Sequence, residues 1–243
     1  MALPKVATAT YELKIPSTGK IVKYRPFLVK EEKMLMMAAD AEGAAIGKTI
    51  KSVLSACAQS KVNIDTLAPF DIEYFFLQLR AKSIGNEIKV RLRKPASIDC
   101  ETENCQQICE VSMDAEDIKL DTEDVPDGKI KITEDIGIKL KYPDIDSMQK
   151  FIATGNDPTA DEIFKIISDC IQYIWEGDEI FQAKDSTKQE LNDFIESLNA
   201  EQFADVRGFF ENMPKLTKDV TWKCSKCEKT TEVKLQGIDA FFA

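Results

Sequence analysis

Residues 220–235, VTWKCSKCEKTTEVKL, place two cysteines, Cys224 and Cys227, between segments in which apolar and polar residues alternate. Alternation of this kind is typical of β-strands. The stretch therefore predicts a strand, a short turn that carries both cysteines, and a second strand. This arrangement is half of a zinc ribbon, in which strands hold cysteine thiolates around one Zn²⁺ ion.

A looser version of the same plan lies earlier in the chain. Residues 88–92 (IKVRL) lead into it and residues 108–113 (ICEVSM) lead out of it, but four residues separate its two cysteines. We predict that the two halves together bind one structural zinc ion through four thiolates, at roughly 2.3 Å per Zn–S bond. The predicted ligands are Cys100, Cys105, Cys224 and Cys227.

Alternatives to this ligand set stay open. Cys109 is a strand residue in this interpretation, or else it replaces Cys100 as a ligand. The C-terminal pair is otherwise a redox pair, a disulfide or two reduced surface thiols; redox Cys-x2-Cys motifs, however, are expected at a helix start beside a βαβ pattern. Cys57 and Cys170 fall on apolar helical faces and are predicted to be small core residues.

The composition argues against an enzyme. The 243 residues include no histidine, which excludes Ser-His-Asp and Cys-His catalysis and the His-x-Glu of zinc deaminases. Four cysteines on one zinc ion leave no open position for a substrate. The segment GAAIGKT at residues 43–49 is one residue too short between its glycines for a phosphate-binding loop. We expect a non-enzymatic protein without a small-molecule substrate.

The net charge of −10 is concentrated in one segment. Residues 99–135 contain 13 acidic residues and 3 lysines, so the rest of the chain is balanced. Such a run is either a solvated face or a docking surface for a basic partner. Nucleic acid is disfavoured as a partner, because phosphate binding depends on clustered lysine and arginine. The acids of the possible docking surface are Asp114, Glu116, Asp117, Asp121, Glu123 and Asp124.

The patterning also predicts the compartment. No stretch approaches the ~20 apolar residues of a membrane span, and the first residues, MALPKVATATYELKIP, lack the layout of a secretory signal. Seven cysteines spaced unlike a disulfide framework agree with a reducing compartment. We therefore expect an intracellular product without membrane insertion.

We predict an α+β fold, with an N-terminal β-hairpin plus helices, a central and C-terminal zinc-ribbon-like β unit, and a helical segment between the ribbon halves. The segments are 1–85 (hairpin and helices), 86–142 (acidic β segment with the first cysteine pair), 143–214 (helical), and 215–243 (second cysteine pair and aromatic tail). Hairpins are expected around residues 16–19 and 134–137, and helices at 29–40, 47–59, 69–85, 144–153, 158–175 and 188–213, the last broken near Asn199.

Residues 10–38, TYELKIPSTGKIVKYRPFLVKEEKMLMMA, resemble the baseplate hub assembly protein family of T-even-like contractile-tailed bacteriophages. The later LRAKSIG and WKCSKC segments and the final aromatic pair are similar to that family as well. The resemblance implies a phage tail morphogenesis protein that assembles the baseplate central hub, as an assembly factor or a minor hub component. It implies other tail and hub proteins as partners, and no catalytic residue.

The same resemblance implies a location in the host cell cytoplasm during assembly, or in the tail baseplate of the virion if the protein is retained there. The competing hypothesis, drawn from the cysteine pattern, is a zinc-ribbon protein that binds nucleic acid or regulates transcription. The C-terminal ribbon is only mildly basic, with 5 lysines against 3 acids over residues 218–235, which gives that alternative weak support.

Overall fold

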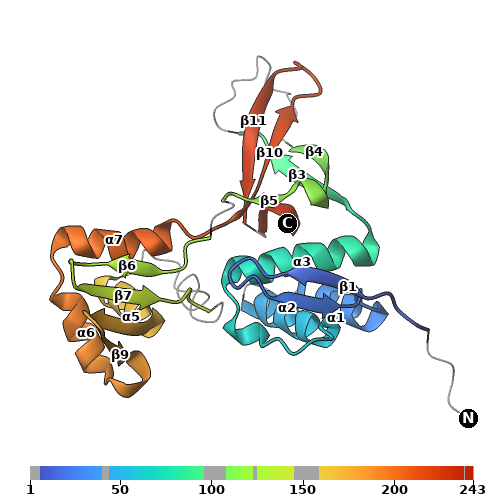
Figure 1. Ribbon diagram of the computed structural model, residues 1–243. Coiled ribbons are helices and arrows are strands. Elements are labelled where there is room, and N and C mark those ends of the chain that lie inside the picture. Colours follow the sequence, from blue (N-terminus) through green and yellow to red (C-terminus); the bar gives the residue numbers. More distant parts are fainter. Residues whose placement is uncertain are drawn as a thin grey trace, which may run out of the picture.

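Three large apolar cores organise the part of the chain that the computed structural model describes, namely residues 6–39, 44–95, 108–122, 125–144, 159–237 and 239–242. The first core belongs to an N-terminal unit, the second to a unit of paired hairpins, and the third to a sheet covered by helices. Figure 1 shows the third unit beside the other two.

The N-terminal unit is a β-hairpin on three helices. Leu13, Val22 and Tyr24 of the hairpin are buried against the helices, and the ring of Tyr24 meets that of Phe75 edge to face at a centroid distance of 5.4 Å. Inward-facing residues alternate along both strands, as a half-buried hairpin requires. The elements are β1 (Tyr11–Lys14), β2 (Ile21–Tyr24), α1 (Val29–Ala39), α2 (Ala44–Cys57), η1 (Ile64–Thr66) and α3 (Pro69–Ile84). The predicted hairpin and the predicted helices of this unit are confirmed.

The hairpin turn is fastened to the start of α3 by Asp71, whose side chain is fully buried. Its carboxylate accepts hydrogen bonds from the backbone N–H of Ser17 at 2.9 Å, from the Ser17 hydroxyl, and from the backbone N–H of Ala68 at 3.2 Å. Burial raises the pKa of Asp71, and the three hydrogen bonds act against that rise. The contact holds together segments 54 residues apart in the chain.

The segment that leaves the hairpin carries a buried ion pair. Arg25 contacts Glu31 Oε1 at 2.9 Å, Lys30 contacts the same oxygen at 3.3 Å, and the backbone N–H of Leu28 donates to Oε2 at 2.8 Å. Burial alone would raise the pKa of Glu31, but these partners outweigh burial and lower it to about 2. Phe27 is half-buried against the first core, whereas Leu28 is 41% exposed.

The second unit combines two hairpins. One is the two-stranded sheet β3–β4, and the other is the β10–β11 hairpin, which gains β5 as a third strand. Phe241 of the closing aromatic pair is 1% exposed and packs in the same core. The elements are β3 (Glu87–Arg93), β4 (Ile108–Asp114), η2 (Ala115–Asp117), β5 (Lys119–Leu120), β10 (Leu216–Lys223), β11 (Thr230–Gln236) and α8 (Asp239–Phe242). The strands flanking both cysteine pairs are confirmed; a zinc-ribbon unit as such is not shown.

The third unit is an antiparallel sheet in the order β6-β7-β8-β9, with three helices packed on its core. The ring of Trp175 on β8 lies over Gly137 of the neighbouring strand β7. Only glycine fits there, since a Cβ at residue 137 would be 1.9 Å from the ring. The elements are β6 (Lys129–Lys131), β7 (Ile136–Leu140), α5 (Ala160–Cys170), β8 (Ile171–Glu176), β9 (Glu179–Gln182), η3 (Ala183–Asp185), α6 (Lys188–Glu196) and α7 (Ala200–Glu211).

Part of the predicted helical segment is wrong. The helix expected over residues 158–175 ends at Cys170, and residues 171–176 form β8, followed by the unpredicted strand β9. The β-branched and aromatic run IQYIW favours a strand, and a two-residue turn begins at Gly177 with φ of 55°. The predicted break near Asn199 is confirmed, because Asn199 caps α7. Residues 145–153 of another expected helix lie outside the described ranges.

The third unit is inserted between two adjacent strands of the second. Leu216 of β10 pairs with Leu120 of β5, so the chain leaves and re-enters the second unit at one place. Asp121 and Lys215 close this neck with hydrogen bonds of 2.9 and 3.0 Å between them. Tyr142 of the inserted unit then meets Phe70 of α3 edge to face at 4.9 Å.

Replacing Asp71 with Asn should lower the free energy of unfolding by about 1–3 kcal/mol. An amide offers one acceptor where the carboxylate offers two, so in either orientation an NH₂ group faces a backbone N–H, of Ser17 or of Ala68. Urea titration would measure the loss. The matched Ser17→Ala variant keeps both backbone donors and should lose less; an equal or larger loss in Ser17→Ala would contradict this account.

The Glu31 carboxylate should make stability depend on pH. Its pKa is lowered from 4.5 to about 2 in the fold, so the stability it contributes is present above about pH 4.5 and is lost as pH falls toward about 2. Chemical unfolding across this range should show wild type approaching the Glu31→Gln variant. The exposed neighbour Glu32 supplies the control: Glu32→Gln should keep the full acid dependence, and a wild-type curve parallel to Glu31→Gln would disprove the assignment.

Candidate functional site

The cysteines Cys224 and Cys227 lie in the turn that joins β10 to β11. The backbone N–H of Cys224 donates to the carbonyl of Lys229 at 2.9 Å, and that of Glu228 donates to the carbonyl of Cys224 at 3.0 Å. Glu228 has φ of 56°, the left-handed conformation that residues other than glycine seldom adopt. These contacts close a tight turn in which Cys224 is fully buried and Cys227 is half-buried.

The end of the other hairpin lies against this turn. Cys109 pairs with Leu92 near the end of the β3–β4 ladder, and both side chains pack against Trp222 and Cys224. Cys109 is therefore a strand residue, which is one of the two alternatives given for it, and is half-buried beside the cysteine turn. The sequence predicted that the two cysteine-bearing hairpins lie together. In the described residues, side chains from the ends of both hairpins pack in one small cluster.

The described residues include two of the four predicted zinc ligands, Cys224 and Cys227. Within them, no group of three or more histidine, cysteine, aspartate or glutamate side chains is placed to hold a metal ion. Cys100 and Cys105, two of the four predicted ligands, lie outside the described ranges. Trp222 Nε1 is buried and has no hydrogen-bond partner among the described atoms. A buried N–H beside cysteines is compatible with metal-bound thiolates, since such sulfurs accept hydrogen bonds.

The other two described cysteines belong to apolar cores. Cys57 and Cys170 are buried, and burial raises their thiol pKa values to about 11 and about 12. At neutral pH both side chains are neutral thiols, which are neither nucleophiles nor ready metal ligands. The prediction that they are core residues is confirmed.

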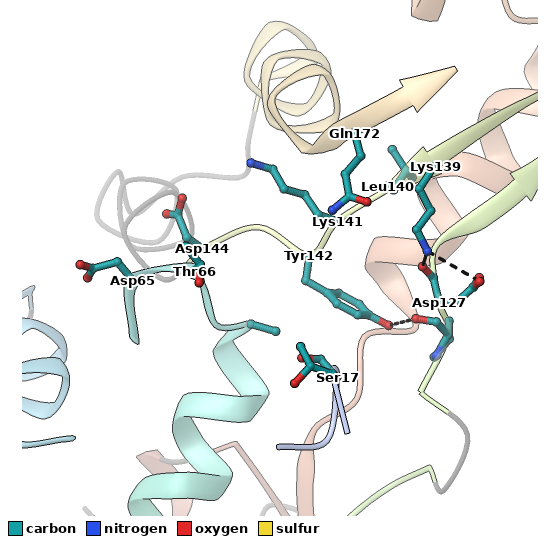
Figure 2. Close-up of a pocket in the computed structure, with 13 residues that line it drawn as sticks. Ser17, Asp65, Thr66, Asp127, Lys139, Leu140, Lys141, Tyr142, Asp144 and Gln172 are labelled. Atoms are coloured by element: carbon teal, nitrogen blue, oxygen red, sulfur yellow. Dashed lines mark hydrogen bonds and ion pairs between the residues drawn. The ribbon is translucent and has the colours of Figure 1, made fainter. Parts of the chain in front are cut away.

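A cleft of about 470 Å³ lies between the N-terminal unit and the inserted third unit (Figure 2). Sequence reasoning missed it, because it is formed by segments that are distant in the chain and share no motif. One wall comes from the hairpin turn and the start of α3, and the other from the end of β7 and the residues after it. The lining residues include Ser17, Thr18, Asp65, Thr66, Pro126, Asp127, Lys139, Lys141, Tyr142, Asp144 and Gln172.

Three charged side chains that line this cleft form ion pairs within the chain. Lys139 contacts Asp127 at 3.6 Å, and Asp65 contacts Lys51 at 3.1 Å (Figure 2 shows the first pair). The phenol of Tyr142 donates to the carbonyl of Pro126 at 2.8 Å, and burial raises its pKa to about 12. Ser17 donates to Asp71, but that carboxylate also holds two backbone N–H groups and is committed to the fold. Lys139, Asp127, Asp65 and Tyr142 of this cleft therefore make polar contacts within the chain.

Acidic residues expected to form a solvated or docking face also serve the fold. Asp114 accepts from the backbone N–H of Glu116 at 2.8 Å, and Asp117 contacts Lys218 at 3.1 Å. Asp121 ties the neck of the inserted unit, as described above. Three of the acidic side chains therefore have a role within the fold, although they stay exposed. Glu123 and Asp124 lie outside the described residues.

Comparison with known proteins gives one result. The family model described as T4 bacteriophage base plate protein matches residues 8–243, which is nearly the whole chain. No curated protein and no solved structure matches. Among the helices of the described ranges, none is long and apolar enough to cross a membrane.

Proposed function

Because the chain belongs to the T4 bacteriophage base plate protein family, we propose that it acts in assembly of the baseplate central hub, as an assembly factor or a minor hub component. The observation that carries the proposal is the extent of the family match, which covers all three units. The finer role in the hub rests on the resemblance of the hairpin and first helix, residues 10–38, to hub assembly proteins.

The chemistry of the described residues supports a protein that works by binding other proteins. The sequence has no histidine, and Lys139, Asp127 and Tyr142 of the cleft make polar contacts within the chain. Exposed apolar side chains, by contrast, gather on α1, where Val29, Met36 and Met37 are each more than 60% exposed. Surfaces of this kind are typical of proteins that meet partners. The proposed partners are other tail and baseplate hub proteins.

The proposed location follows from this role: the host cell cytoplasm during assembly, and the tail baseplate if the protein is retained. The nucleic-acid-binding alternative gains nothing from the structure or the family match. Its requirement for a basic surface conflicts with the net charge of −10.

Phage carrying a nonsense mutation in the gene for this chain should fail to build hubs. Infected cells should accumulate tail parts without complete baseplates, seen by electron microscopy of lysates, and expression of the intact chain should restore them. Mass spectrometry of purified virions and of hub proteins co-purified from infected cells would separate a retained component from a transient factor. Normal baseplates in the mutant infection would refute the hub role.

We also propose one structural zinc ion, bound by Cys100, Cys105, Cys224 and Cys227. Its support is the tight turn at Cys224 and the position of the last β3–β4 pair, Arg93 with Ile108, from which the segment bearing the other two cysteines departs. When bound, zinc would crosslink the two hairpins and stabilise the second unit.

The purified protein should contain about one equivalent of zinc by elemental analysis. The double variant Cys224→Ser/Cys227→Ser should lose it. Comparison of Cys100→Ser with Cys109→Ser identifies the fourth ligand, because only the true ligand reduces the zinc content. A full metal equivalent in the double variant would show that the ligand set is wrong.

A further inference from the structure

Strand β9 forms one edge of the third unit's sheet and is exposed along its whole length. Ile180 is 59% exposed and Phe181 is 46% exposed, although adjacent strand residues point to opposite faces. In the described part of the chain, β8 is the neighbour of β9 on one side and no strand pairs with the other side. An apolar edge of this kind is a template for another strand.

The backbone of β9 is set for such pairing. The turn at Gly177 and Asp178 joins β8 to β9, and Glu176 faces Glu179 directly across it. Pairs in an antiparallel ladder alternate between hydrogen-bonded and non-hydrogen-bonded. With Glu176 and Glu179 as the hydrogen-bonded pair that closes the turn, the N–H and C=O groups of Ile180 and Gln182 are directed away from β8.

One contact between this edge and the same edge of another molecule is complementary in charge. The β8–β9 hairpin, residues 171–182, contains the acids Glu176, Asp178 and Glu179 and no lysine or arginine. The first basic residue after it is Lys184, which is exposed and lies two residues beyond the strand. In a two-fold antiparallel arrangement, the acidic turn of each copy lies at the end of the strand where the other copy carries Lys184.

We propose that β9 pairs antiparallel with β9 of a second copy of this chain, centred on Phe181. This register places Ile180 opposite Gln182 of the second copy, joined by the outward backbone groups, and brings Asp178 toward its Lys184. Phe181 meets its counterpart in a non-hydrogen-bonded pair, where side chains approach most closely. The alternative centre at Ile180 opposes Phe181 to Glu179 and loses the contact with Lys184.

The proposed dimer is weak and independent of the hub role. A strand of four residues buries less area than stable interfaces of roughly 1,600 Å². Pairing is therefore expected at high protein concentration or where other contacts hold two copies together. Because the charge contacts are exposed, the association weakens as salt rises.

A cysteine introduced at position 181 tests the register. Opposed non-hydrogen-bonded residues have Cα atoms about 4.5 Å apart, within disulfide reach. Phe181→Cys should therefore form a covalent dimer under mild oxidation, and mass spectrometry should find the disulfide joining the two copies of the peptide that carries the substitution. The matched Ile180→Cys variant, which lies opposite Gln182 rather than itself, should crosslink far less. Equal crosslinking of the two variants, or none by Phe181→Cys, overturns the proposal.

Sedimentation equilibrium of charge variants without introduced cysteines tests whether Asp178 and Lys184 contribute to the association. Lys184→Asp should weaken association by about tenfold, and adding Asp178→Lys to that variant should restore it. Both side chains are exposed, so circular dichroism should show unchanged folding. Met36→Lys on α1 is the control for an unrelated apolar surface and should have no effect. A monomer at every concentration, or a dimer sensitive to Met36→Lys but not to Lys184→Asp, rejects this interface.

Discussion

A single buried carboxylate fixes the helix on which the rest of the molecule is built. Asp71 binds the hairpin turn through Ser17 and the start of α3 through Ala68, and thereby sets where that helix begins. From there α3 serves all three units: Phe75 and Leu79 enter the first core, Leu77 and Ala81 the second, and Phe70 meets Tyr142 of the third. The helix is apolar around most of its circumference because its sides pack against the first core, the second core and Tyr142.

Local sequence predicted the elements whose pattern agrees with their surroundings. The hairpin around residues 16–19, the helices of the N-terminal unit and the break at Asn199 follow from alternation, helical spacing and capping residues. Strand β8 was missed, because Ile171, Ile174 and Trp175 continue the apolar spacing of α5. The same residue types also favour a strand, and pairing with β7 decides between the two. Short apolar runs are ambiguous in this way.

The candidate sites also differ in whether local sequence could predict them. Cys224 and Cys227 could be located from their flanking strands, since the turn and its neighbours are contiguous in sequence. The cleft beside Tyr142 and the exposed edge at Phe181 could not, because both depend on how distant segments pack. The family match agrees with one feature of the structure. A baseplate protein needs surfaces for other proteins, and the described chain presents exposed apolar side chains on α1 and β9.

The insertion between β5 and β10 also orders events during synthesis. The N-terminal unit and the inserted sheet can each bury its own core as the chain emerges, whereas the second core waits for Leu216, Leu235 and Phe241. Until these three residues leave the ribosome, one side of α3 and the β3–β4 hairpin stay uncovered. Domains fold as units during translation, so the second unit can close only after the β10–β11 hairpin and α8 have been synthesised, although its first hairpin is made much earlier.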